Sequence, residues 1–271
     1  MLKLTFLGTS GDSSVTAKQI RASGGIILQV NELQFHIDPG PGALVRAKEF
    51  QINPRATTAI LVSHNHLNHV NDLNAVIDAM TLGGFDKKGI LISNQNVVNN
   101  ALSEFHRSCL ERIITLSPLQ TIGIEDVEIQ AVPVYHTEAA AIGFKIICPT
   151  VTIGYTGDTG FNEALCEALK DSGILIINMT YPENTPTQTH LNRDTAIRLI
   201  ESIRPQLAIL THFGFNMLKA DPIMNARFMQ IKTGIATVAA HDGLVITPTS
   251  YMEPKPKRII PKEPQRLRDE V

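Results

Sequence analysis

Three histidines lie close together directly after a short apolar run, and this cluster is the strongest chemical signal in the sequence. His64, His66 and His69 follow the run Ala59–Val62. Alternation along an extended segment places His64 and His66 on one side, and a turn into the next helix brings His69 to a neighbouring position. Because imidazole is the commonest metal ligand, the cluster predicts a metal site. Isolated histidines are more often structural, and we interpret three others in that way: His36, His106 and His241.

Three further candidate ligands also come directly after apolar runs. His136 and His212 each follow such a run, and Asp158 lies in the turn Gly157-Asp158-Thr159. Side chains at strand ends can converge on the rim of a rigid sheet. Taken alone, Asp158 would serve equally well as a cap of the following helix or as a loop-shaping residue. Together with five histidines, it is predicted to be a metal ligand.

The distribution of apolar residues predicts strands with helices inserted between them. Runs rich in β-branched residues predict strands at Leu2–Leu7, Ile26–Val30, Gln34–Ile37, Ala59–Val62, Val127–Val132, Ile142–Cys148, Val151–Tyr155, Ile174–Asn178, Leu207–Thr211, Ile235–Ala239 and Leu244–Thr247. Three- and four-residue spacing and capping residues predict helices at Pro41–Phe50, Asn71–Met80, Asn96–Leu110, Asn162–Lys170 and Asn192–Ile203. Asp221 and Pro222 begin another helix, which Gly234 ends. This α/β order favours two sheets packed face to face with helices outside.

The last residues differ in composition from the body of the chain. Residues 254–271 are rich in proline, lysine and arginine, whereas residues 1–253 show no internal repeat and no long linker. We therefore expect one domain at 1–253 and a tail at 254–271. The tail is most simply a solvated extension, although a basic arm on a polyanion or on a partner subunit is the alternative. A homo-oligomer is left open.

The composition of the chain indicates where in the cell the protein functions and which partners it lacks. The 271 residues include 24 lysines and arginines against 26 acidic residues, a net charge of −2, so no global positive field attracts nucleic acid. Three widely spaced cysteines fit reduced thiols better than a disulfide framework. The sequence shows neither a signal peptide nor a run of about 20 apolar residues that could span a membrane. We expect a cytoplasmic protein with no membrane partner.

The order of these motifs resembles the metallo-β-lactamase superfamily, especially its ribonuclease Z-like and phosphodiesterase branches. Ser63–His69 is similar to the family's HxHxDH motif, and Phe35–Gly42 to its second motif, in which Asp38 would support the site without binding metal. Four further segments match in order: Phe6–Ser10, His136, Gly157–Thr159 and Leu210–Gly214. Asp242-Gly243 resembles a common late element. The resemblance implies a four-layer αββα sandwich with the site at one edge of both sheets.

The resemblance also implies a ligand assignment for two ions. His64, His66 and His136 would bind the first, His69 and His212 the second, and Asp158 would bridge them. Nitrogen and carboxylate ligands without thiolate suit Zn²⁺, with Mn²⁺ or Fe²⁺ as alternatives, and one or two ions are expected. A pair of such ions polarises an ester oxygen and lowers the pKa of a shared water, which supplies hydroxide at neutral pH.

One position departs from the family motif. Asn68 stands where HxHxDH has aspartate. A neutral amide is a weak ligand, so the second site loses a negative charge, and the candidate proton acceptor is lost as well. The chain could be an enzyme with one tight and one loose metal, a degenerate binding protein, or a form carrying an engineered substitution. These alternatives stay open.

His190 and the spacing of the ligands bear on the substrate. His190 resembles the histidine that, in ribonuclease Z-like members, assists the leaving group or contacts phosphate. About twenty residues separate His136 from Asp158, too few for the tRNA-binding arm of bacterial ribonuclease Z, which disfavours tRNA. We expect hydrolysis of a small-molecule or short-nucleotide phosphodiester. A non-catalytic metal- or ligand-binding protein and a thioester hydrolase are the alternatives. Lys18, Arg21 and Arg193 are candidate phosphate contacts.

Overall fold

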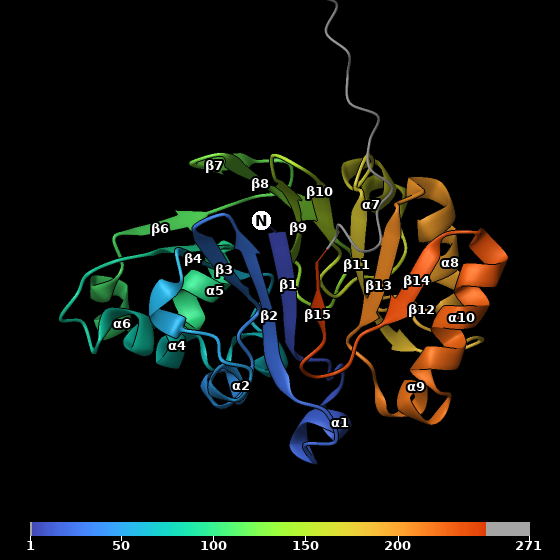
Figure 1. Ribbon diagram of the computed structural model, residues 1–271, viewed down its shortest axis with the longest axis horizontal. Coiled ribbons are helices and arrows are strands. Elements are labelled where there is room, and N and C mark those ends of the chain that lie inside the picture. Colours follow the sequence, from blue (N-terminus) through green and yellow to red (C-terminus); the bar gives the residue numbers. More distant parts are fainter. Residues whose placement is uncertain (1, 248–271) are drawn as a thin grey trace, which may run out of the picture.

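Two sheets lie face to face in the computed structural model, which describes residues 2–247, and helices cover their outer faces (Figure 1). The helices drawn in blue and teal flank one sheet, and those in yellow to orange flank the other. This arrangement confirms the predicted αββα sandwich. The tail predicted at 254–271 lies outside the described residues, so the boundary at residue 253 stays a prediction.

The first sheet combines an antiparallel half with a parallel half. In spatial order its strands are β15 (Val245–Ile246), β1 (Leu2–Gly8), β2 (Ser23–Val30), β3 (Leu33–Ile37), β4 (Ala59–Val62), β5 (Ile90–Ser93) and β6 (Arg112–Thr115). The pairs β1–β2 and β2–β3 are antiparallel, whereas β3 to β6 run parallel. The carboxyl ends of β3 and β4 therefore meet at one edge of the sheet.

The second sheet has the same division. Its order is β14 (Ala236–Ala239), β13 (Leu207–Thr211), β11 (Ile174–Tyr181), β10 (Thr152–Tyr155), β9 (Ile142–Ile147), β8 (Val127–Pro133) and β7 (Thr121–Ile124), with β12 (Leu191–Asn192) beside β11. Strands β10, β11, β13 and β14 are parallel, so the loops after β10 and β13 leave the same edge. Open sheets with parallel strands place ligand sites at such carboxyl ends.

Helices cover both outer faces. Beside the first sheet lie α2 (Ala43–Glu49), α3 (Leu67–Val70), α4 (Leu73–Thr81), α5 (Gln95–Asn100) and α6 (Glu104–Cys109), with the 3₁₀ turn η1 (Pro54–Ala56). Beside the second lie α7 (Glu163–Ala168), α8 (Arg193–Ile203), α9 (Phe215–Lys219) and α10 (Pro222–Thr233), and α1 (Ser13–Ala17) follows β1. Among residues 2–247, no helix has the length and apolar character needed to cross a membrane.

Capping residues set several helix boundaries where the sequence predicted them. The Asp221 side chain accepts hydrogen bonds from the Ile223 and Met224 backbone N–H groups, and Gly234 ends α10 with a φ of 70°. Asn192 caps α8 by accepting from the Thr195 N–H. These caps satisfy backbone groups that the helix itself leaves unpaired, so the local sequence is sufficient to define the ends.

Apolar side chains fill the three interfaces between layers. Between the sheets, Phe6 and Phe35 belong to the same core cluster as Phe144 from the opposite sheet, and all three are fully buried. A second cluster packs α7, α8 and α10 on the outer face of the second sheet, and a third packs α4, α5 and α6 on the first. Strands covered on both faces are mostly apolar, and accordingly β4 is apolar throughout and β13 is apolar up to Thr211.

One predicted helix was wrong in its extent. The single helix expected over Asn96–Leu110 is two short helices, α5 and α6, with a break between them. The Ser103 side chain accepts from the His106 N–H and begins α6 as a new helix. Arg107 bonds the Val98 carbonyl across the break. The apolar spacing continues through both helices because both face the same sheet, which is why periodicity alone joined them.

Candidate metal centre

The six predicted ligands converge at the shared edge of the two sheets. His64 follows β4, His66 and His69 lie at α3, and the other three follow strands of the second sheet. Their donor atoms form two groups in which all atoms lie within 4.8 Å of one another. We call His64, His66, His136 and Asp158 the first donor set, and His69, His212 and Asp158 the second donor set.

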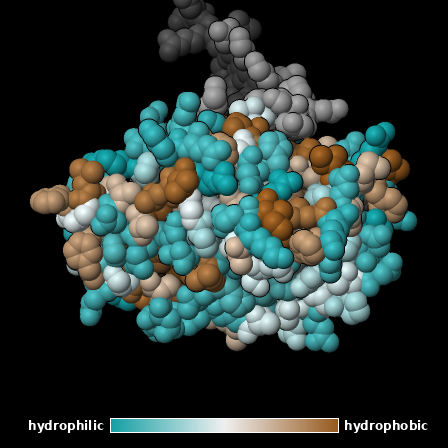
Figure 2. Space-filling model, turned by 90° about the horizontal axis from the view of Figure 1, so that it is seen from below, coloured by the Kyte–Doolittle hydropathy of each residue, from teal (hydrophilic) through white to brown (hydrophobic). Residues whose placement is uncertain are grey.

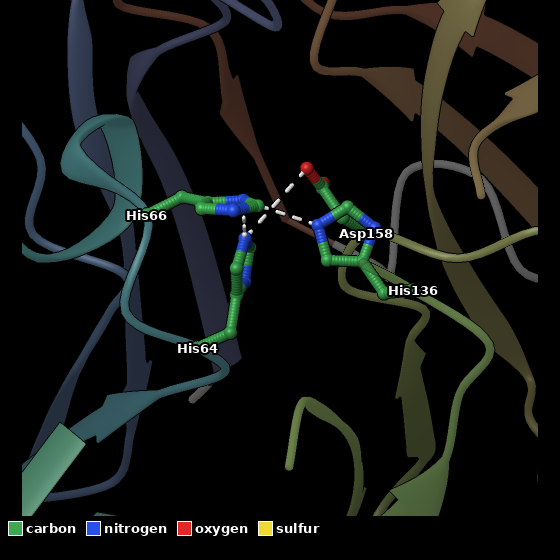
Figure 3. Close-up of side chains that lie close together, drawn as sticks. All are labelled: His64, His66, His136 and Asp158. Carbon is green, nitrogen blue, oxygen red and sulfur yellow. Dashed lines mark hydrogen bonds and ion pairs between the residues drawn. The ribbon is translucent and has the colours of Figure 1, made fainter. Parts of the chain in front are cut away.

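In the first donor set, three imidazole nitrogens face a common point (Figure 3). The His66 Nδ1 lies 2.9 Å from the His64 Nε2 and 3.1 Å from the His136 Nε2. The Asp158 Oδ2 lies 3.9 Å from the His64 Nε2. Figure 3 shows His64 and His66 on one side and His136 and Asp158 on the other, so both sheets contribute to the set.

The second donor set shares Asp158 with the first. The His212 Nε2 lies 3.1 Å from the Asp158 Oδ1 and 3.0 Å from the His69 Nε2, and the His69 Nε2 lies 3.4 Å from the Asp158 Oδ2. All three residues are buried. One carboxylate therefore reaches both sets, which is the geometry of a bridging ligand.

The outer nitrogens of four imidazoles are held by fixed partners. The His64 Nδ1 pairs with the Ser63 Oγ at 3.0 Å, and the His69 Nδ1 with the Asp38 Oδ2 at 2.9 Å. The His136 Nδ1 faces the Thr189 carbonyl and the His212 Nδ1 faces the Thr180 hydroxyl, both at 3.0 Å. Metal-binding histidines characteristically have such a partner on the ring nitrogen away from the ion.

These observations test whether the residues fit divalent ions. Two donors at about 2.1 Å from one ion lie up to roughly 4.2 Å apart, so groups within 4.8 Å need only small shifts to share an ion. The inner nitrogens of the five imidazoles also face one another, and those of His69 and His212 face the Asp158 carboxylate as well. Inward lone pairs with outward partners are what cation binding requires, and the donor set fits.

The electrostatics also favour a cation. Burial lowers the pKa of His69, but the Asp158 and Asp38 carboxylates outweigh it and raise the pKa to about 10. Burial lowers the pKa of His212 to about 3 and that of His64 well below its ordinary value, with His69 adding to both effects. Neutral imidazoles are the ligand form, and a positive charge is stable between the two buried carboxylates.

Asn68 is at the second donor set, where its sequence position predicted it. Its Nδ2 lies 3.1 Å from the His212 Nε2. The backbone there is closely packed, because a Cβ added to Gly40 would lie 2.0 Å from the Asn68 carbonyl oxygen. The Asn68 backbone is thus closely packed, and the neutral amide lies beside His212 at the position where the HxHxDH motif carries a charge.

His190 lies at the rim of the same centre. Its Nδ1 is 3.8 Å from the Asp158 Oδ2 and 3.4 Å from the Thr180 hydroxyl. The side chain keeps 21% exposure, so substrate can reach it. Burial lowers the pKa of His190, with Asp158 opposing, so the imidazole is neutral and carries one N–H donor.

The histidines interpreted as structural lie outside both donor sets. The buried His36 Nε2 is 2.8 Å from the Gly24 carbonyl, and burial lowers its pKa to about 4. His106, on α6, contacts Ser103, which caps that helix, and His241 contacts the neighbouring Asp242 backbone. Arg193, a candidate phosphate contact, lies 3.2 Å from the Glu183 carboxylate and over the Phe228 ring, so its charge already has an internal partner.

Two supporting residues were not predicted from the sequence. The Glu138 carboxylate accepts the Asn65 N–H at 2.7 Å and thereby joins the loop of His64 and His66 to the loop of His136. Asn178 donates to the Asp158 Oδ1 at 2.8 Å. Neither residue carries a local pattern. The position of Glu138 two residues after a candidate ligand was the only available signal.

A two-sheet sandwich with a histidine and aspartate centre at its edge defines the class of metallo-β-lactamase folds. Residues 34–213 match the family model described as a beta-lactamase superfamily domain. The chain belongs to the metallo-β-lactamase superfamily.

Two relatives are similar to the chain in sequence, and one solved structure is similar to it in fold. The uncharacterised protein MJ1374 of Methanocaldococcus jannaschii is 34% identical over 253 residues, which cover 90% of this chain and 94% of the relative. A ribonuclease Z of Pyrobaculum calidifontis is 24% identical over 79% of this chain and 87% of the relative. The metallo-β-lactamase fold protein YhfI of Bacillus subtilis superimposes with a TM-score of 0.75, at 17% identity over 90% of this chain and 98% of its own.

Proposed function

We propose that the protein, a metal-dependent hydrolase by fold and family, hydrolyses a small-molecule or short-nucleotide phosphodiester. The observation that carries the proposal is the convergence of five imidazoles and the shared carboxylate of Asp158 on one edge. Divalent ions there, most simply Zn²⁺, would polarise a phosphoryl oxygen and lower the pKa of a bound water. The relationship to a protein named ribonuclease Z supports phosphodiesters as the substrate class.

The residues of the site would have separate roles in this reaction. The two donor sets would hold the ions, and Asp158 would keep their separation constant because it reaches both. His190 would donate its N–H to a phosphoryl or leaving-group oxygen from the rim of the site, since its side chain is partly exposed. Figure 2 shows the molecule from below, where polar residues surround separate apolar patches.

The alternative is a protein that binds metal or ligand without turnover. The specific observation that favours it is Asn68, whose neutral amide stands beside His212. The two functions differ in one measurement: both predict bound metal, but only the first predicts turnover. A thioester hydrolase would bind the same ions and differ in substrate.

The test combines metal analysis with a substrate comparison. Protein purified without chelator would be analysed for bound metal and assayed against a bis-aryl phosphodiester and a thioester, with Zn²⁺ or Mn²⁺ added. We expect metal-dependent turnover of the phosphodiester. His64→Ala should abolish it, whereas His106→Ala, which removes a histidine outside both donor sets, should not. Bound metal without turnover of either ester would support the binding role.

A further inference from the structure

A buried polar network connects the shared carboxylate to the support of the second donor set. Asn178, on β11, is only 2% exposed. Its Nδ2 donates to the Asp158 Oδ1 at 2.8 Å and to the Tyr155 hydroxyl at 3.2 Å, so both N–H groups have acceptors. The opposite amide orientation would place a carbonyl oxygen against a carboxylate. The chemistry of the contacts therefore fixes the amide.

The network continues from Tyr155 back to the donor set. The Tyr155 hydroxyl donates to the Asp38 Oδ2 at 2.6 Å, and the same carboxylate oxygen is 2.9 Å from the His69 Nδ1. Ser63 also donates to Asp38, through its N–H and its hydroxyl, each at 2.7 Å. Since the His69 Nε2 lies 3.4 Å from Asp158, the contacts form a closed ring of five residues: Asp158, Asn178, Tyr155, Asp38 and His69.

We propose that Asn178 and Tyr155 are positioning residues. They hold the side chains of Asp158 and His69 in the geometry that binds the second ion. The inference rests on the metal-binding function proposed above. Asn178 fixes one oxygen of Asp158 on the side of His212, so the other oxygen is left toward His69 and His64. Tyr155 links that constraint to Asp38, which orients the His69 ring.

The two donor sets should depend on this ring to different degrees. If Asp158 turns away, the first donor set keeps three imidazoles, but the second keeps only His69 and His212. Asn68 cannot replace the lost charge. The second ion should therefore respond strongly to a change in Asn178, and the first only weakly.

A purely structural role would give a different result. Buried polar groups need partners for stability wherever they lie, so removing any such partner lowers the melting temperature. Asn225 offers a matched comparison, because it is also buried, at 4% exposure, and donates to the Ala220 and Asp221 carbonyls away from the centre. A positioning role predicts a change in metal binding that Asn225 does not share.

The experiment is a Co²⁺ titration of the full chain, followed by visible absorbance and by chelator competition. The variants are Asn178→Leu, Tyr155→Phe and, as control, Asn225→Leu. Tyr155→Phe removes one hydroxyl only and covers the case in which Asn178→Leu fails to fold. We expect both ring variants to weaken the second ion by about 10- to 100-fold and to change its absorbance bands, with the first ion changed much less. Asn225→Leu should lower the melting temperature alone.

Each outcome decides one point. Second-ion affinity in Tyr155→Phe and Asn178→Leu that stays at the unmodified value, or falls only as far as in Asn225→Leu, overturns the positioning role. Unmodified protein that binds one ion, with an affinity and absorbance that neither ring variant changes, overturns it as well, because the second donor set would then hold none. Unmodified protein that binds no ion overturns the proposed function itself, so the two failures are distinguishable.

Discussion

The two donor sets differ in the number of their donors and in the burial of those donors. The first has four donors, and one of them, His66, is exposed. The second has three, and all are buried. Its His69 is hydrogen-bonded to the buried Asp38, and its His212 to the buried Thr180. Asn68 adds an amide to the second set where the family motif carries a carboxylate. The second set, whose donors are all buried, thus has fewer donors than the first, although both share the same carboxylate.

Removing the shared carboxylate should produce the largest effect. Asp158→Asn deprives both donor sets of their only common anionic ligand, so we expect metal content to fall at both. Phosphodiester turnover should drop by at least ~100-fold, because even indirect supports of a metal ligand contribute 10- to 100-fold. Metal analysis and the bis-aryl assay measure this. Asp86→Asn is the control, since Asp86 pairs with Arg55 on the surface. Two retained ions in Asp158→Asn would show that the sets do not share it.

Chelator titration tests whether the two donor sets differ in their affinity for metal. The first set has four donors, whereas the second has three and the neutral amide of Asn68, so the first ion should be retained at least ~10-fold more tightly, because each missing ligand weakens the binding of a divalent ion. We expect release in two separate steps as chelator is added to the metal-loaded protein. Release of both ions in one step would contradict the expected difference in affinity. A protein in which only the second set is filled would contradict it as well.

Restoring the family residue should reduce that asymmetry. Asn68→Asp is nearly isosteric and adds one negative charge beside His212, so second-ion affinity and turnover should both rise, by about 10-fold. Metal content and turnover should be measured on both proteins in the same buffer. A gain in metal without a gain in turnover would favour the binding role. A loss of metal would mean that Asn68 is not beside the second ion.

His36 provides the smallest expected effect on metal. It is buried like the second donor set but bonds only the Gly24 carbonyl, so His36→Gln should change metal affinity less than about 2-fold. Its pKa of about 4 lies below the ordinary 6.5. Between these values the unfolded chain takes up a proton that the folded protein does not, so folding stability falls as pH drops from 6.5 to 4, by about 3 kcal/mol in the limit.

Denaturant unfolding at pH 7.5 and pH 5 measures the contribution of His36. The difference in unfolding free energy between the two pH values should be smaller in His36→Gln than in the unmodified protein, since glutamine does not titrate. An equal difference in both proteins would show that His36 is protonated while folded. A large loss of bound metal in His36→Gln would show that His36 contributes to the metal centre.

The sequence by itself determined the parts of this protein that depend on neighbouring residues. The apolar runs at Ala59–Val62 and Leu207–Thr211 are strands with the predicted bounds, and Asp221 and Gly234 bound α10. The six candidate ligands follow from residue type and from their position after such runs. Caps and strand ends act within a few residues, so a single sequence contains the information needed to find them.

Only the tertiary structure decided how these ligands are supported. Tyr155 bonds Asp38 across 117 residues of sequence, and Asn178 meets Asp158 from the neighbouring parallel strand. Glu138 bonds Asn65 across 73 residues. No periodicity encodes such pairs, because each side chain alone is an ordinary polar residue on an apolar strand or in a loop. They become a network only when two sheets that share an edge bring them within hydrogen-bonding distance, which local sequence patterns do not specify.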